Sequence, residues 1–153
     1  MQVEAVGNCI YIGDDQTHLL VDTGISKEKD RRRVGQNWRI KGDELEGILI
    51  THEHVDHIQG LGVFSRKYEI PIYATPGTIA GIRNYKKLGN LPDGLLHEVD
   101  IDQPFSLGTL NIDPFAISHD ANEPSGYRID NGKKVVAVAT DLGIYDDYTV
   151  EHL

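Results

Sequence analysis

The sequence has almost no cysteine, no long apolar run and no excess of basic charge, and each absence excludes a class of protein. Cys9 is the single cysteine among 153 residues, which excludes an internal disulfide and is typical of a reducing compartment. No apolar run approaches the roughly 20 residues that a membrane-spanning helix needs. The first residues also lack the basic and apolar pattern of a secretory signal. We therefore expect a cytoplasmic protein without a membrane segment.

The charge balance limits the kinds of partner. Asp and Glu together number 24 against 15 Lys and Arg, for a net charge of −9. A protein that coats nucleic acid over its whole surface is basic, so this balance excludes one, although it allows a local basic patch. Hydrophobic residues at 39% and charged residues at 25% are those of an ordinary globular chain. The length suits a single domain, which we expect to span residues 1–153.

Short apolar runs separated by turn residues predict a mostly β chain with a few helices. Strands are expected at 8–12, 18–22, 47–51, 71–74, 96–99, 110–117, 127–129 and 134–139. Asn131-Gly132 is a hairpin-turn pair between the last two strands. Apolar residues three and four apart predict a helix over 56–68, with Asp56 as its N-cap. Pro76 opens another helix, which Gly89 closes.

Metal-binding side chains crowd together directly after the strand expected at 47–51. The residues are His52, His54, Asp56 and His57, and imidazole and carboxylate are ligands suited to zinc and similar ions. On an extended segment alternate side chains point the same way, so His52 and His54 can converge on one ion. Asp56 and His57 lie at the turn into a helix and can serve a second ion. A one-metal protease helix needs His-Glu-x-x-His, but Asp56 stands where its second histidine belongs.

Four motifs resemble, in order, those of the metallo-β-lactamase fold hydrolases. Residues 51–57, Thr-His-Glu-His-Val-Asp-His, resemble the His-x-His-x-Asp-His signature of that family. The other motifs are Leu20-Val21-Asp22-Thr23-Gly24, Ile117-Ser118-His119-Asp120 and Ala139-Thr140-Asp141-Leu142-Gly143. The resemblance implies a layered α/β fold, an αββα sandwich with mixed or antiparallel sheets between flanking helices.

The resemblance also implies a role for each of these residues. The ligands are divided between two ions, the first held by His52, His54 and His119, the second by Asp56 and His57, with Asp141 bridging. The two ions are divalent, zinc by preference with manganese or iron as alternatives, and they act through a shared hydroxide. Asp56 is the expected catalytic residue, because it can also assist proton transfer. Asp22 either orients a ligand or caps the end of its strand.

The chain departs from the family pattern at its end. The family normally supplies a further histidine from a late loop and a second half of the fold, whereas this chain starts a helix near Asp146 and stops at Leu153. His152 matches no motif. We therefore expect an incomplete form of the fold that lacks its C-terminal part. Self-association through the surface left by the missing half is an expected consequence.

Two features favour a phosphodiester substrate. The stretch Lys27–Arg33 is basic in an acidic chain and can hold phosphate, although a solvated surface helix explains it equally well. In addition, Gly7-Asn8 and Pro124–Tyr127 resemble one bacterial branch of the family, small DNA exonucleases linked to cell-wall regulatory operons. We expect a metal-dependent phosphodiesterase with nucleic acid as substrate. The alternatives are a same-fold hydrolase of carbonyl substrates, such as a thioesterase, lactonase or β-lactamase, and a non-catalytic metal-binding half-domain.

Overall fold

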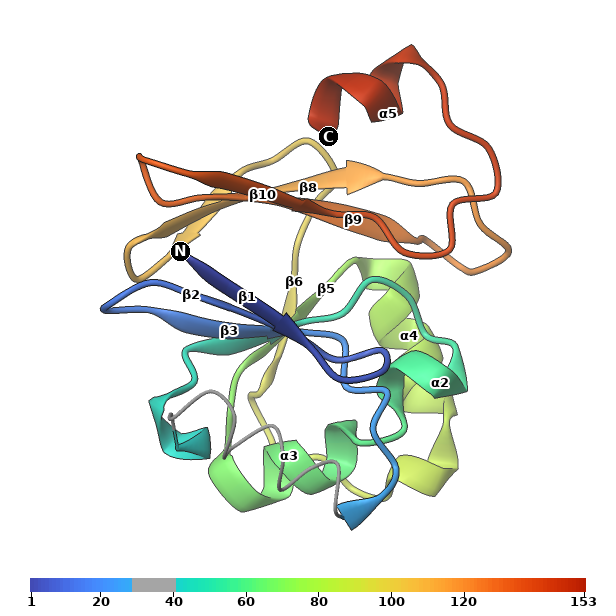
Figure 1. The fold of residues 1–153 in the computed structure, drawn as a ribbon. Helices are drawn as coiled ribbons and strands as arrows, with labels where there is room; N and C mark the ends of the chain where they lie inside the picture. The colour runs from blue at the N-terminus through green and yellow to red at the C-terminus, as the bar shows by residue number, and fades with distance from the viewer. Residues whose placement is uncertain (29–40) are drawn as a thin grey trace.

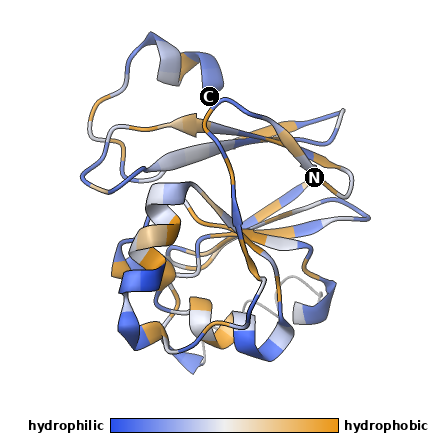
Figure 2. Ribbon diagram, turned by 180° about the vertical axis from the view of Figure 1, so that it is seen from behind, coloured by the Kyte–Doolittle hydropathy of each residue, from blue (hydrophilic) through white to orange (hydrophobic). Residues whose placement is uncertain are grey.

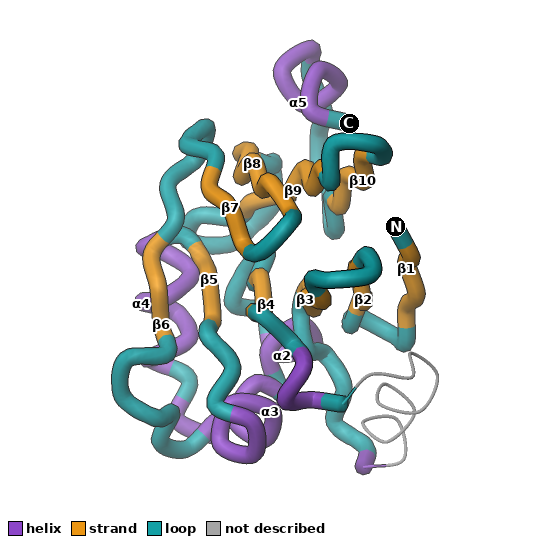
Figure 3. The backbone as a smooth tube through the Cα atoms, turned by 90° about the vertical axis from the view of Figure 1, so that its left-hand side faces the viewer, coloured by secondary structure: helices purple, strands orange, loops and turns teal. Residues whose placement is uncertain are grey.

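Two stacked β-sheets with helices on both outer sides make up the computed structural model, which describes residues 1–28 and 41–153 (Figure 1). The predicted basic stretch falls largely outside the described residues. The layering is easiest to follow in the side view, where the strands form two rows and the helices flank them (Figure 3). The predicted αββα arrangement is therefore confirmed.

The first sheet is mixed and the second is antiparallel. The first contains, in spatial order, β1 (Gln2–Ala5), β2 (Ile10–Gly13), β3 (His18–Val21), β4 (Gly47–Leu49), β5 (Ile72–Ala74) and β6 (Leu96–Glu98). Its first three strands are antiparallel, and β3 to β6 run parallel. The second contains, in spatial order, β10 (Val135–Val138), β9 (Ser125–Asp130), β8 (Leu110–Ala116) and β7 (Phe105–Leu107).

Helices cover the outer side of each sheet. Those beside the first sheet are α2 (Val55–Ile58), α3 (Leu61–Tyr68) and α4 (Pro76–Asn84), with short 3-10 turns η1 (Gly42–Glu44) and η2 (Lys86–Leu88). Of the described helices, α5 (Asp147–His152) is the one on the outer side of the second sheet. None of the helices in the described ranges is long and apolar enough to cross a bilayer.

The core has two apolar layers, because side chains alternate across the strands of the first sheet. Leu20 and Ile48 belong to the layer between this sheet and its helices, whereas Leu19 and Leu49 belong to the layer between the two sheets. All four are fully buried. Figure 2 shows apolar residues along the inner strands, both apolar and polar residues on the helices beside the first sheet, and polar residues on many of the outer turns. This packing gives the loops at the strand ends a rigid base.

The helix predicted over 56–68 is wrong in its continuity and in its cap. The chain forms α2 and α3 instead, and the N-cap of α2 is His54, so that Asp56 lies inside the first turn. The break comes at Gly60, whose amide donates to the carbonyl of Thr23 over 2.9 Å. A β-carbon on Gly60 would lie 2.6 Å from the carbonyl oxygen of Ile25. The helix therefore breaks where it packs directly against the loop after β3.

Other boundaries differ less. Pro76 begins α4 as predicted, but the helix ends at Asn84 because Tyr85 leaves the helical region, with φ −86° and ψ 87°. The hairpin at Asn131-Gly132 is present between β9 and β10. Two strands were missed. The strand β1 is exposed along its whole length, and β7 has only three residues, so neither carries a clear apolar pattern.

Candidate metal centre

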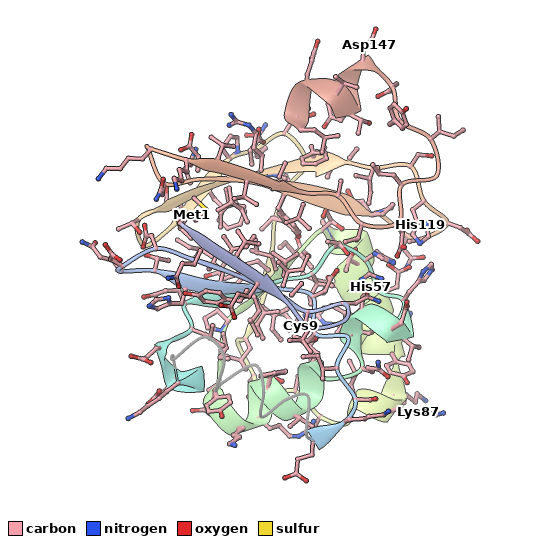
Figure 4. All side chains as sticks on the ribbon, in the orientation of Figure 1. Met1, Cys9, His57, Lys87, His119 and Asp147 are labelled. Carbon is pink, nitrogen blue, oxygen red and sulfur yellow. The ribbon has the colours of Figure 1, made fainter. Side chains whose placement is uncertain are left out.

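The predicted ligands come from four loops that meet at one end of the sandwich. Asp22 follows β3 and the 51–57 loop follows β4, and these parallel neighbours bring their carboxyl ends to the same edge. From the second sheet, His119 follows β8 and Asp141 follows β10. In Figure 4, His57 and His119 lie at the same end of the molecule, one from each sheet. The fold therefore brings together motifs that span most of the chain.

Three imidazoles make the first ligand group. One ring nitrogen from each of His52, His54 and His119 lies within 4.8 Å of the others. Nε2 of His119 is 3.1 Å from Nδ1 of His54, and the His52 ring centroid is 4.7 Å from those of both other rings. Three neutral imidazoles around one point form a typical three-ligand set for a zinc ion. The predicted first set is therefore assembled in space.

A second group shares a residue with the first. It consists of His52, His57 and Asp141, again with ligand atoms within 4.8 Å of one another. Oδ2 of Asp141 lies 3.3 Å from Nε2 of His52, 2.8 Å from Nε2 of His57 and 4.0 Å from Nε2 of His119. One carboxylate oxygen thus lies beside imidazoles of both groups, as a bridging ligand must.

The buried nitrogens of this centre fit a cation. Nε2 of His52 and Nε2 of His57 are both inaccessible to solvent, and neither has a hydrogen-bond partner despite the nearby Asp141 oxygen. A buried polar atom without a partner is costly, typically about 1–3 kcal/mol. Two such atoms aimed at one carboxylate oxygen indicate metal ligands more readily than a hydrogen-bonded core.

Asp56 occupies a different position from the other candidates. Its side chain is 68% exposed, and its Oδ2 lies 3.7 Å from Nε2 of His57. Asn8 donates from Nδ2 to this oxygen over 3.3 Å and to the Asp56 carbonyl over 3.1 Å. Asp56 belongs to neither of the two groups described above, and it faces solvent beside the second one.

The buried carboxylate of Asp22 orients His57 directly and His52 through Thr51. Asp22 is 2% exposed, and its Oδ2 accepts from Nδ1 of His57 over 2.7 Å and from the hydroxyl of Thr51 over 2.7 Å. The Thr51 hydroxyl oxygen lies in turn 2.9 Å from Nδ1 of His52. Because a carboxylate only accepts, Nδ1 of His57 carries a proton, and so does Nδ1 of His52 through the Thr51 hydroxyl; in its neutral form each ring then presents the lone pair of Nε2. Asp22 is therefore more than the cap of a strand end.

The histidines differ in their affinity for protons. Burial, together with the neighbouring His57, His54 and His119, lowers the pKa of His52 to about 4. His52 is thus neutral near pH 7, the form that binds metal. Burial opposes a charge on His57 as well, but Asp22 and the other carboxylates nearby outweigh it and raise the pKa of His57.

The loop that carries His119 is tied to the signature loop by a residue outside the predicted set. Oε1 of Glu53 accepts from the backbone amide of Asn122 over 2.8 Å, and the amide of Ser125 donates to the carbonyl of Thr51 over 2.8 Å. The Glu123 carboxylate also accepts from the amide of Gly77, at the start of α4. The signature motif did not indicate that Glu53 links the two loops, because its hydrogen-bond partner lies about 70 residues later in the chain.

Gly24 controls the approach of the β3 loop to Asp56. A β-carbon at this position would lie 1.8 Å from the Asp56 carbonyl oxygen and 2.7 Å from the β-carbon of Asn8. We expect Gly24→Ala to lower the free energy of unfolding by about 1–3 kcal/mol, the usual cost of overpacking. Urea denaturation measures this change, and a loss below about 0.5 kcal/mol would show that the loop relaxes without cost.

The chain matches a family model and shares sequence with curated bacterial proteins. Residues 17–153 match a family model described as the beta-lactamase superfamily domain. Over 143 residues the chain is 36% identical to a protein of Bacillus anthracis named exodeoxyribonuclease YycJ. This alignment covers 94% of this chain and 53% of that protein. Over 141 residues it is 37% identical to exodeoxyribonuclease WalJ of Streptococcus pneumoniae, covering 92% of this chain and 52% of that protein. The chain spans about half the length of these curated relatives.

Solved structures share the fold. The Zn²⁺-bound PqqB of Methylobacterium extorquens superposes with a TM-score of 0.75 at 17% identity, over 92% of this chain and 55% of that one. YhfI of Bacillus subtilis, a metallo-beta-lactamase fold protein, superposes with a TM-score of 0.71 at 21% identity, over 91% of this chain and 56% of that one. At these identities the likeness concerns the fold alone. The assignment of individual ligands stays a prediction, which the distances above support.

Proposed function

The chain belongs to the beta-lactamase superfamily, and from that membership and the geometry of its metal centre we propose that it is a metal-dependent phosphodiesterase that releases nucleotides from DNA ends. The observation that carries the proposal is the position of Asp141, whose Oδ2 lies between imidazoles of two ligand groups. The names of the relatives in Bacillus and Streptococcus support DNA as the substrate. Since this chain spans about half of each, the substrate of the whole protein is part of the proposal.

The residues have distinct tasks under this proposal. His52, His54 and His119 would hold one divalent ion, His57 and Asp56 would hold a second, and Asp141 would be a ligand shared by the two sets. Zinc is the preferred ion for these ligands, with manganese or iron as alternatives. When bound, such ions would lower the pKa of water and stabilise negative charge on the oxygens of the attacked phosphate. The imidazole nitrogens would supply lone pairs to the ions, and the carboxylates would offset the positive charge.

Asp56 is placed to move a proton. Its exposed carboxylate lies at the solvent side of the centre, and the amide of Asn8 donates to its Oδ2. A carboxylate held at a fixed place beside the reacting centre can accept a proton from water and pass it to the leaving oxygen. Asn8 thereby acts as a positioning residue for Asp56.

Asp56→Ala should abolish nucleotide release from duplex DNA in the presence of Mn²⁺ or Zn²⁺. General acid–base assistance contributes roughly 10²–10⁴-fold to a rate, so we expect a loss of at least 10²-fold, with further loss if the second ion departs. The assay follows acid-soluble nucleotides from end-labelled DNA with purified protein. Asp120→Ala is the matched control, because this exposed carboxylate lies next to His119 and outside both ligand groups.

The opposite outcomes separate the alternatives. If wild type and Asp56→Ala are equally inactive on DNA with every metal tried, the phosphodiesterase proposal fails for this chain. Hydrolysis of thioesters, lactones or β-lactams by the same preparation, without action on DNA, would instead identify a carbonyl hydrolase.

We place the protein in the cytoplasm, where its single thiol stays reduced. Cys9 is fully buried, and burial raises the pKa of its thiol, so the residue is protected from oxidation. Self-association stays a prediction, and sedimentation at several concentrations tests it: a clean monomer at all of them would contradict it.

A further inference from the structure

A third cluster of metal-binding side chains lies on the opposite layer of the molecule, between α5 and the second sheet. It consists of Asp102 in the loop before β7, Asp113 on β8 and His152 at the end of α5. One ligand atom from each lies within 4.8 Å of the others. Nε2 of His152 is 3.4 Å from Oδ1 of Asp102 and 4.0 Å from Oδ2 of Asp113. None of these residues belongs to the candidate metal centre.

The imidazole of His152 is oriented as a metal-binding histidine is. Its Nδ1 lies 2.8 Å from the backbone carbonyl of Tyr148, which can only accept, so Nδ1 carries the proton. The other nitrogen, Nε2, is then directed at the two carboxylates. A hydrogen bond from the far ring nitrogen to a carbonyl is the usual support of a metal-bound histidine. The ring also stacks on Phe115, with centroids 5.2 Å apart, which fixes its plane.

Apart from the imidazole of His152, the carboxylates of the cluster have no basic partner among the described residues. Within residues 1–28 and 41–153, no Lys or Arg forms an ion pair with Asp102 or Asp113. Arg128 is the cross-strand neighbour of Asp113 in the sheet register, yet no ion pair joins the two. Oδ1 of Asp113 is buried and has no hydrogen-bond partner. A positive charge between these groups would satisfy both carboxylates.

The backbone and a tyrosine hold the acidic side of the cluster in place. The Tyr148 hydroxyl donates to Oδ1 of Asp102 over 2.7 Å and accepts from the amide of Ala116 over 3.1 Å. Asp102 has φ 60°, a left-handed conformation that aspartate tolerates better than most residues. Its amide donates to the carbonyl of Pro114 over 2.8 Å. The loop, the strand and the helix are thus already joined around the cluster.

We propose that Asp102, Asp113 and His152 bind a divalent transition-metal ion that fastens α5 to the second sheet. Two carboxylates and one imidazole suit Zn²⁺ or Mn²⁺, with water completing the coordination. The ion would add a further link between α5 and the second sheet, beside the hydrogen bonds that join Tyr148 to Asp102 and Ala116. This site is independent of the proposed nuclease activity, and its test does not depend on that activity.

The test compares metal binding and helix protection in matched variants. Chelator-stripped protein is titrated with Zn²⁺ against a competing fluorescent chelator. Hydrogen exchange is followed at the Val150 amide of α5, which donates to the carbonyl of Asp146, the N-cap residue of that helix. The test variants are His152→Gln and Asp113→Asn. Glu151→Gln is the control, because this exposed residue lies on the same helix outside the cluster. Circular dichroism confirms that each variant is folded.

The unaltered chain and Glu151→Gln should each bind one more equivalent of Zn²⁺ than His152→Gln and Asp113→Asn. Zn²⁺ should slow exchange at the Val150 amide in the first pair and leave it unchanged in the second. Tyr148→Phe, which removes the hydrogen bond to Asp102, should weaken binding at this site about tenfold. Equal Zn²⁺ stoichiometry in all variants would overturn the proposal. Protection that depends on pH but not on Zn²⁺ would also overturn it, and would show that the cluster carries a proton instead.

Discussion

Asp141→Asn should lower the rate of nucleotide release by roughly 10³-fold and remove one equivalent of metal per chain. Loss of one ion forfeits several kcal/mol of charge stabilisation, and each 1.36 kcal/mol corresponds to a factor of ten in rate. The neutral amide keeps the size of Asp141 but cannot place a charged oxygen between His52 and His57. Asparagine also tolerates the positive φ of 54° found at this position. The loss is therefore expected from chemistry rather than from misfolding.

Asp120→Asn is the matched control for Asp141→Asn. It removes an exposed carboxylate near His119 that belongs to neither ligand group, so both rate and metal content should stay unchanged. Steady-state rates and elemental analysis on the same preparations provide the comparison. Full metal content and full activity in Asp141→Asn would show that Asp141 does not bridge the two ligand groups.

Asp22→Asn should weaken metal binding by about 10- to 100-fold without any change at a ligand, because orienting residues have effects of this size. In this variant the side-chain oxygen can still accept from the Thr51 amide. The side-chain NH₂ group then faces Nδ1 of His57. That nitrogen must then accept, so the proton moves to Nε2 and blocks the lone pair that faces the metal. The measurement is Zn²⁺ affinity by chelator competition.

Two further variants separate orientation from stability. Asp22→Ala leaves the buried His57 nitrogen and the Thr51 groups without an acceptor, at a position with φ 60°. We expect it to lower the free energy of unfolding by about 3–5 kcal/mol, as breaking a buried pair does. Thr51→Ser keeps both hydrogen bonds and should bind metal like the unaltered chain. If Asp22→Asn binds Zn²⁺ with unchanged affinity, the orienting role of Asp22 is wrong.

The order of the motifs was sufficient to predict which loops meet. Strands can turn only at the two ends of a sandwich. Asp22, the loop after β4, His119 and Asp141 each follow a strand, and all of them lie at the same end. The division of His52 and His54 from Asp56 and His57 stays a prediction, since His52 belongs to both ligand groups and Asp56 to neither. The sequence was less informative about Asp56, because local alternation does not reveal that its carboxylate faces solvent beside Asn8.

The features that were not predicted all depend on contacts distant in sequence. The helix over 56–68 breaks because Gly60 meets the loop after β3, about 35 residues earlier. Glu53 contacts Asn122, and His152 reaches Asp102 and Asp113. Helical periodicity and ligand spacing report only neighbours along the chain, so these residues acquire their roles only once the layers are stacked.

Anomalous X-ray diffraction from crystals grown with Zn²⁺ tests the two-metal centre most directly. We predict one peak among His52, His54 and His119 and a second beside His57 and Asp141, with Asp56 turned toward it. The two peaks should be about 3.5–4 Å apart, the usual separation in two-metal hydrolytic sites. A single peak in this region, or none within coordination distance of His52, would contradict the account.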